Sequence, residues 1–161
     1  MSAPSETTAK LVSIMKPTMH PDVPVSQRLN RRSFWRSIGR IEHERLEFKA
    51  SANHLRDGIA AMAMSHGGVI VLGVSDDRRL VGHALDQLTL DKIATVAYES
   101  GVDVGVRAIT VGRVPLTMIV VPAVQDRIVT TPDGRLLRRV GSANQPLRGD
   151  AVTRFVLARA A

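Results

Sequence analysis

The apolar and polar residues around position 47 alternate in a way that predicts a half-buried β-strand. Leu46 and Phe48 alternate with charged residues, so one face of this strand packs on a core and the other carries charge. Residues 69–74 are apolar at successive positions, which is typical of a central strand covered on both faces. The pattern therefore indicates a sheet whose core lies on both sides of at least one strand.

Apolar residues at helical spacing predict four helices. They are a short helix with a basic face within residues 28–40, a helix that Ser51 or Asn53 caps and Gly67-Gly68 ends, a helix at about residues 89–99, and a final helix at residues 150–158. Trp35 lies in the first of them. We interpret it as a residue that packs on the core rather than one that stacks on a nucleobase.

Turn signals predict two β-hairpins in the second half of the chain. One joins residues 102–111 to residues 116–122, and the other joins residues 127–131 to residues 136–140 through Pro132-Asp133-Gly134. A short return strand is also predicted at residues 80–82. This mixture of hairpins and helical crossovers indicates an α+β fold, a single domain with a mixed β-sheet flanked by helices.

The first 32 residues differ in composition from the rest of the chain. Pro17, Pro21 and Pro24 exclude a continuous helix there, and large apolar residues are few. We therefore predict a flexible N-terminal arm over residues 1–32 and one folded domain over residues 33–161.

The charge of the chain is strongly basic and unevenly distributed. There are 22 Lys and Arg residues against 15 Asp and Glu, giving a formal net charge of +7. Residues 26–56 carry eight basic and three acidic groups and residues 127–161 carry seven and two, whereas residues 57–126 carry five and eight. Two interpretations stay open, a solvated surface or a polyanionic partner, most simply nucleic acid.

Several chemistries are excluded by what the chain lacks. Without cysteine it has no disulfide, thiolate zinc site or cysteine nucleophile. The motifs of P-loop ATP sites, dinucleotide folds, serine hydrolases and HExxH metalloproteases are absent as well. The longest apolar run, residues 69–74, is far shorter than the ~20 residues of a membrane-spanning helix, so we expect a cytoplasmic protein without membrane contact.

Acidic residues lie around the two predicted strands. Glu42 and Glu47 are five positions apart around the first strand, and Asp76 and Asp77 follow the second. Carboxylates that converge at strand ends need a divalent cation to offset their repulsion, and oxygen ligands select Mg²⁺ or Mn²⁺. Spacing alone leaves another interpretation open, namely a turn at the Asp pair and a solvated glutamate.

Four segments of the chain form a characteristic set in a fixed order. They are Glu-His-Glu-Arg-Leu-Glu-Phe-Lys at residues 42–49, a helix end with Gly-Gly at residues 60–68, Val-Leu-Gly-Val-Ser-Asp-Asp at residues 71–77, and Leu-Arg-Arg-Val-Gly-Ser-Ala-Asn at residues 137–144. Together they resemble the Schlafen AlbA-type domain family. The resemblance covers about residues 40–158 and implies a single-domain microbial member. The sequence departs from the family pattern at Ser65-His66, where the family has Asn-Thr.

This resemblance implies a nucleic-acid-binding domain and, by analogy with animal members, a metal-dependent endoribonuclease that cuts structured RNA such as tRNA. Carried over by motif, the catalytic and metal-binding residues would be Glu42, Glu47 and Asp76, with Mg²⁺ or Mn²⁺ as cofactor. The basic residues expected to contact the phosphate backbone are Lys49, Arg138, Arg139 and Arg148. For Lys49 the alternative is a pairing with Glu47. Because animal members use two lobes, we expect a homodimer here.

Two further functions remain open from the sequence. Many microbial members of the family are described as DNA-binding or transcriptional regulatory domains, which bind without cutting. The other possibility is an interaction module with no nucleic-acid role, whose basic surface is only solvated. Metal dependence separates a nuclease from a regulator, and salt-dependent binding separates both from the interaction module.

Overall fold

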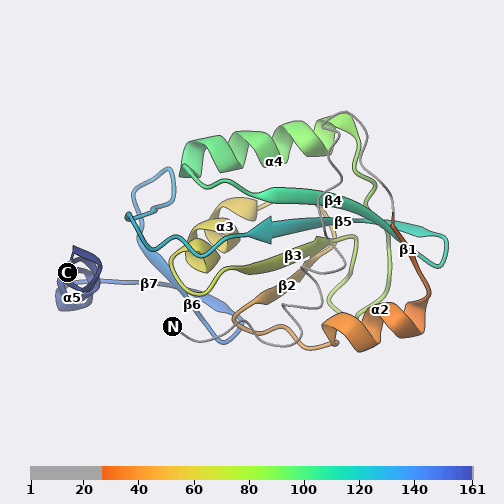
Figure 1. The fold of residues 1–161 in the computed structure, drawn as a ribbon, viewed down its shortest axis with the longest axis horizontal. Helices are drawn as coiled ribbons and strands as arrows, with labels where there is room; N and C mark the ends of the chain where they lie inside the picture. Colours follow the sequence, from red (N-terminus) through yellow and green to blue (C-terminus); the bar gives the residue numbers. More distant parts are fainter. Residues whose placement is uncertain (1–26, 161) are drawn as a thin grey trace.

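The fold is built on one mixed β-sheet with helices on both of its faces (Figure 1). The computed structural model describes residues 27–160. In chain order the elements are β1 (Gln27–Leu29), α2 (Arg31–Ile38), β2 (Leu46–Lys49), α3 (Leu55–Ala63), β3 (Gly68–Leu72), α4 (Gln87–Ser100), β4 (Gly105–Val111), β5 (Val114–Val121), β6 (Leu137–Val140), β7 (Ala143–Pro146) and α5 (Asp150–Ala160).

The five-stranded sheet has the order β1-β4-β5-β3-β2, so β2 is an edge strand. β2 runs parallel to β3 and β1 runs parallel to β4, whereas β5 is antiparallel to both β3 and β4. β6 and β7 form a separate antiparallel hairpin in which Arg139 faces Asn144. This arrangement confirms the predicted α+β fold with a mixed sheet.

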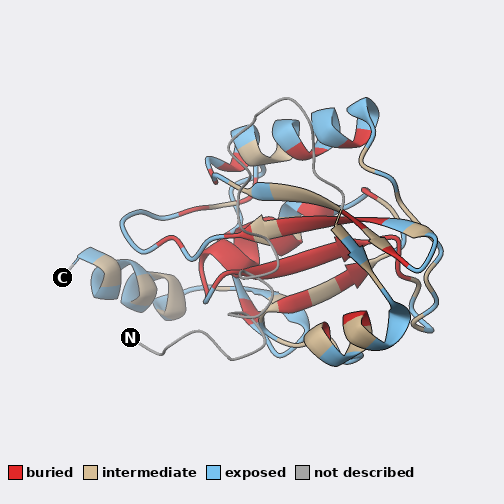
Figure 2. Ribbon diagram, turned by 45° about the vertical axis from the view of Figure 1, so that its right-hand side comes forward, coloured by how far each residue is buried: buried red, intermediate tan, exposed pale blue. Residues whose placement is uncertain are grey.

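Two apolar clusters lie on the two faces of the sheet. One cluster joins Ile59 of α3 and Ile93 of α4 to Ile70 of β3. The other cluster joins Phe34 of α2 to Phe48 of β2. All five residues of β3 are buried, and Figure 2 shows this strand as a buried band through the centre of the molecule. The continuous apolar run therefore corresponds to burial on both faces, as predicted.

The predicted helices are confirmed, with differences at their ends. α4 begins at Gln87, before the predicted start, because the Asp86 carboxylate accepts a hydrogen bond of 2.8 Å from the Thr89 backbone N–H. α3 follows His54, whose backbone is left-handed and whose side chain makes no capping hydrogen bond, so neither Ser51 nor Asn53 is its cap. The predicted return strand at residues 80–82 is reduced to one bridge between Val74 and Leu80.

The predicted pairing of residues 127–131 with residues 136–140 is wrong. Residues 131–135 form a closed local turn, in which the Thr131 backbone N–H donates to the Arg135 carbonyl at 2.9 Å and the Thr131 hydroxyl donates to the Asp133 carboxylate at 2.5 Å. β6 follows this turn. It pairs with β7, the next strand along the chain. The turn signal was real, but it marks an isolated turn rather than a hairpin.

The folded part begins before the predicted boundary at residue 32. Residues 27–29 form β1 beside β4, and Arg31 and Arg32 open α2. The rest of the predicted arm, residues 1–26, lies outside the described residues. Between residues 27 and 160 no helix combines the length and apolar character needed to cross a bilayer.

Candidate functional site

Glu47 occupies the middle of the edge strand β2, and its carboxylate lies against α3. The side chain is only 14% exposed. A Cβ at Gly58 of α3 would come within 2.5 Å of Glu47 Oε2, so the missing side chain of Gly58 leaves the room that this carboxylate occupies. Oε2 is buried and has no hydrogen-bond partner among the described residues. The strand pattern predicted an outward charged face, but Glu47 is a largely buried carboxylate.

Arg139 of β6 supplies the charge that faces Glu47. Its side chain is completely buried, and its Nη1 lies 3.5 Å from Glu47 Oε1. The remaining donors are used by protein acceptors: Nη1 donates to Asn144 Oδ1 at 2.9 Å, and Nη2 donates to the carbonyls of Leu46 at 3.2 Å and His43 at 3.3 Å. Arg139, which we predicted to contact phosphate, therefore faces protein groups and holds the β6–β7 hairpin to the start of β2.

The backbone of Arg139 is anchored as well. Its N–H donates to the Ser65 hydroxyl at 2.8 Å, across 74 positions of sequence. Ser65 is one of the two residues at which the sequence departs from the family pattern. The hydroxyl at this position thus fixes β6 beside the end of α3.

Glu42 accepts a backbone hydrogen bond at the edge of the sheet. Its Oε1 accepts a hydrogen bond of 2.9 Å from the backbone N–H of Phe48 in β2. An edge strand leaves such N–H groups without a neighbouring strand, and a carboxylate is a strong substitute acceptor. Glu42 therefore stabilises β2 on its open side.

Asp76 lies exposed in the turn that follows β3. Its carbonyl accepts a hydrogen bond of 3.1 Å from Arg78 Nη1. The neighbouring Asp77 organises the turn through its carboxylate, which accepts from the Ser75 hydroxyl and pairs with Arg79 Nε at 2.9 Å. The hydrogen bond from Ser75, followed by the charge of Arg79, lowers the pKa of Asp77. The Asp pair thus has the turn role that spacing left open.

The three carboxylates do not form a metal-binding group in this arrangement. Within residues 27–160 no three His, Cys, Asp or Glu side chains lie close enough together to hold a metal ion. Glu42 accepts from β2, Glu47 faces a buried guanidinium, and Asp76 lies in an exposed turn. Oxygen ligands for Mg²⁺ or Mn²⁺ must converge on one point, and these residues do not fit that requirement.

His43 beside the buried arginine is held neutral. Burial, followed by the charges of Arg139 and Arg45, lowers the pKa of its imidazole. Its Nδ1 accepts a hydrogen bond of 3.2 Å from the Arg45 backbone N–H, which requires that nitrogen to be unprotonated. His43 is therefore part of the packing around Arg139 and adds no positive charge to the surface.

Three of the predicted phosphate-contacting residues keep free cationic groups. Arg138 and Arg148 are exposed and Lys49 is half-buried, and none of them has an ion-pair partner among the described residues. Arg138 alternates with the buried Arg139 along β6, and its guanidinium lies 5.6 Å from the ring centre of Phe155 in α5. The alternative pairing of Lys49 with Glu47 is not formed, since Glu47 faces Arg139 instead.

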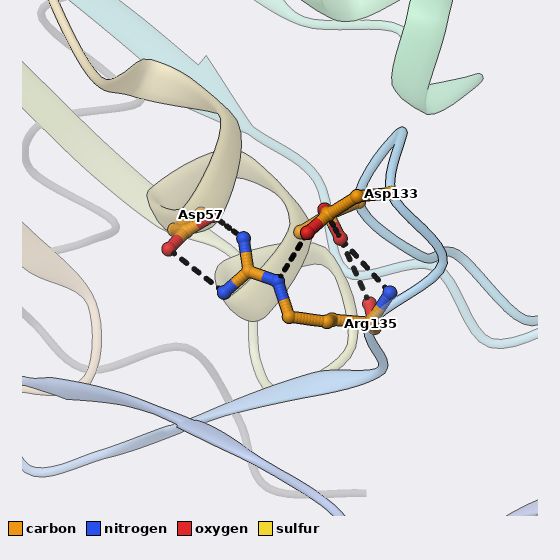
Figure 3. Close-up of polar contacts among 4 residues, drawn as sticks. Asp57, Asp133 and Arg135 are labelled. Atoms are coloured by element: carbon orange, nitrogen blue, oxygen red, sulfur yellow. Dashed lines mark hydrogen bonds and ion pairs between the residues drawn. The ribbon is translucent and has the colours of Figure 1, made fainter.

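The turn before β6 is tied to α3, which positions the strand that carries Arg138 and Arg139. Figure 3 shows the guanidinium of Arg135 between the carboxylates of Asp57 and Asp133. Arg135 Nη2 lies 2.9 Å from Asp57 Oδ1, and Arg135 Nε lies 2.8 Å from Asp133 Oδ2. The hydrogen bond from Arg135, followed by that from Thr131, lowers the pKa of Asp133 to about 2. Charge-assisted contacts of this kind fix the turn at neutral pH.

The structure also gathers arginines that the sequence interpretation did not select. Arg78 and Arg79, from the turn after β3, lie around the same hollow as Arg31, Arg32 and Arg40. A signal was present, because the basic helix was recognised and two arginines directly follow the Asp pair. What the sequence did not reveal is that the turn lies next to the helix.

Comparisons with known proteins agree with the resemblance found in the sequence. The family model described as Schlafen, AlbA_2 matches residues 42–148. Thirteen chains of solved structures match significantly. One is the DIP2311 protein from Corynebacterium diphtheriae, with 21% identity and a TM-score of 0.58, covering 88% of this chain and 30% of that chain. The present chain thus spans less than a third of that protein, and the likeness shows the fold. No curated protein gives a significant match.

Proposed function

The chain belongs to the Schlafen AlbA_2 family, and from this premise we propose that it binds nucleic acid through the free cations Lys49, Arg138 and Arg148, here called the basic set. The observation that carries this proposal is their lack of carboxylate partners among the described residues. Some other exposed arginines are paired: Arg56 lies 3.0 Å from Glu99, and Arg127 lies 3.1 Å from Asp126. Cations without such partners are the ones available to phosphate.

Binding of this kind holds the phosphate backbone and does not read the base sequence. Arg offers a planar fork of donors that matches two phosphate oxygens, whereas Lys contributes a point charge. The buried Arg139 supports the interface by fixing β6, from which Arg138 projects. Two copies related by a two-fold axis would double this surface, as we expect for a homodimer.

The test is a triple substitution of the basic set. We expect Lys49→Gln/Arg138→Gln/Arg148→Gln to weaken binding of a fluorescent single-stranded RNA or DNA by about 10- to 100-fold in fluorescence anisotropy. The slope of log Kobs against log salt should become shallower by about 2, since each lost contact to a single strand removes about 0.7. The loss of charge at the contact, not the loss of fold, is the cause, because Arg138 and Arg148 are exposed and Lys49 is half-buried.

A matched control removes the same charge elsewhere. Arg56→Gln/Lys92→Gln/Arg127→Gln also removes two arginines and one lysine from exposed positions. This control should bind within about twofold of the wild type, since distant exposed charges are screened. Equal losses in the two triple variants would refute the assignment to the basic set, and binding that does not respond to salt would favour an interaction module.

Metal-dependent cleavage of RNA is the second candidate. One observation favours it, namely the buried Glu47 Oε2 that has no hydrogen-bond partner among the described residues. Within residues 27–160 the three carboxylates do not converge on one point, which is the arrangement that metal-dependent cleavage would need. A nuclease would lose activity in chelator, whereas a binding module would keep its affinity.

A further inference from the structure

A hollow of about 710 Å³ lies between α2 and the turn that follows β3. We call it the arginine hollow. Five of its seven lining residues are arginines, and the full set is Arg31, Arg32, Trp35, Arg40, Arg78, Arg79 and Leu80. None of its lining residues belongs to the basic set.

Helix α2 forms one wall of the hollow, and its buried residues hold it in place. Phe34 and Ile38 of α2 are buried against the sheet, whereas Arg31 and Arg32 in the first turn of the helix are exposed. The Asn30 side chain caps the helix by accepting a hydrogen bond of 2.8 Å from Ser33 N–H. The first turn contains no acidic residue, so nothing within it offsets the two arginines.

Arg78 fixes the turn wall to the segment that follows α2. Its Nε donates to the Arg40 carbonyl at 2.7 Å, and its guanidinium lies 4.8 Å from the ring centre of Phe48. The backbone of Arg78 is left-handed, with φ 63°, a conformation that costs free energy for any residue with a Cβ. These side-chain contacts hold a strained turn in one position, and the hollow is consequently preformed.

Trp35 forms part of the floor and orients another arginine. The Arg40 guanidinium lies 4.5 Å from the Trp35 ring centre, while Phe34 and Phe48 meet that ring edge-on at 5.1 and 5.8 Å. The ring is therefore occupied by protein groups, which supports the interpretation of Trp35 as a packing residue. Arg40 is held by this contact beside the hollow.

The charge of the hollow is left largely uncompensated. Within the described part of the chain, Arg79 is the only one of its five arginines with a carboxylate partner, Asp77 at 2.9 Å. Like charges in one concave site repel one another, and a bound anion relieves that repulsion. A preformed hollow with several guanidinium groups therefore favours a ligand that brings more than one negative charge.

We propose that the arginine hollow binds adjacent phosphate groups, either those of a nucleic-acid strand or those of a free polyphosphate. Guanidinium groups match phosphate oxygens in pairs, and arginines on two facing walls suit two neighbouring phosphates better than one. The nucleic-acid form of this inference rests on the proposed function, whereas the polyphosphate form does not. A strand that reaches the hollow would contact the protein at a second place besides the basic set.

The experiment compares two pairs of variants with two probes. The probes are inorganic tripolyphosphate, measured by calorimetry, and a fluorescent single-stranded RNA, measured by anisotropy. Arg31→Gln/Arg32→Gln removes charge from the helix wall and Arg79→Gln removes it from the turn wall, all at exposed positions. Arg36→Gln is the matched control, because Arg36 is exposed on the same helix and does not line the hollow.

We expect both hollow variants to bind tripolyphosphate at least about tenfold more weakly than the wild type, and the control to bind it within about twofold. A parallel loss of RNA affinity identifies a nucleic-acid strand as the source of the phosphates, and unchanged RNA affinity identifies a free polyphosphate. Tripolyphosphate binding that is absent, that survives in both hollow variants, or that Arg36→Gln weakens equally would overturn the inference.

The triple variant of the basic set keeps the two proposals distinguishable. Lys49→Gln/Arg138→Gln/Arg148→Gln should bind tripolyphosphate as the wild type does, since none of these residues lines the hollow. If the wild type binds tripolyphosphate but no RNA or DNA, the proposed function is refuted and the inference about the arginine hollow is supported. If the wild type binds RNA but no tripolyphosphate, the inference about the arginine hollow is refuted and the proposed function is supported.

Discussion

Replacement of Arg139 by methionine should lower the free energy of unfolding by about 3–5 kcal/mol, because it leaves the buried Glu47 carboxylate without its counter-charge. The carbonyls of His43 and Leu46 would also lose their donor, and both belong to the segment that starts β2. Urea denaturation followed by circular dichroism measures the change. Methionine has a similar length and fills much of the same space, so the loss reports on charge and hydrogen bonds more than on a cavity.

The neighbouring residue provides the control for this experiment. Arg138→Met changes the same residue type on the same strand, but Arg138 is exposed and its effect should stay within about 0.5 kcal/mol. Glu47→Gln introduced into the Arg139→Met variant should recover part of the stability, since it removes the unpaired charge. A loss of less than about 1 kcal/mol for Arg139→Met would contradict the structural role given to this arginine.

Gly67→Ala should destabilise the fold by about 2–4 kcal/mol, as measured by thermal and urea unfolding. Gly67 has a left-handed backbone with φ +70°, and a Cβ there would lie 2.6 Å from the Val121 carbonyl oxygen and 2.8 Å from the Ala123 nitrogen. Both atoms belong to the backbone at the end of β5, so they cannot turn aside as a flexible side chain would. The substitution must move either the chain after α3 or the end of β5.

Gly101→Ala separates backbone strain from this steric overlap. Gly101 follows α4 with φ +66°, nearly the same conformation, but no atom lies within 4 Å of the position that its Cβ would take. It should therefore cost only about 1 kcal/mol, the expense of a left-handed alanine. Similar losses at the two positions would show that the close approach to β5 has no energetic consequence.

The fold follows from the sequence where burial follows a simple period. Leu46 and Phe48 of β2 are buried as their alternation predicts, and β3 is buried throughout as its continuous apolar run predicts. The strand β7 was missed because Ala143–Pro146 carries no apolar alternation. Its position depends on contacts made elsewhere in the chain, such as that of Asn144 with Arg139.

Only part of the candidate site could be predicted, because the residues next to a side chain in the sequence do not determine which distant residues it contacts. Lys49, Arg138 and Arg148 have no ion-pair partner among the described residues, whereas Arg139 is buried. The period of two along β6 contained this signal, since Arg139 falls on the same face as the buried Leu137. That Arg139 faces Glu47, 92 positions away, depends on how the hairpin packs on β2 and could not be read locally.

We propose that this protein binds nucleic acid through its arginines and lysine without needing a metal. The most direct measurement incubates the protein with end-labelled tRNA, single-stranded DNA and duplex DNA, each with Mn²⁺ or with EDTA, and reads native and denaturing gels. We expect shifted bands on the native gel in both conditions and intact nucleic acid on the denaturing gel. Cleavage that requires Mn²⁺ and disappears in Glu47→Gln would instead show a metal-dependent nuclease and would give Glu47 a catalytic role.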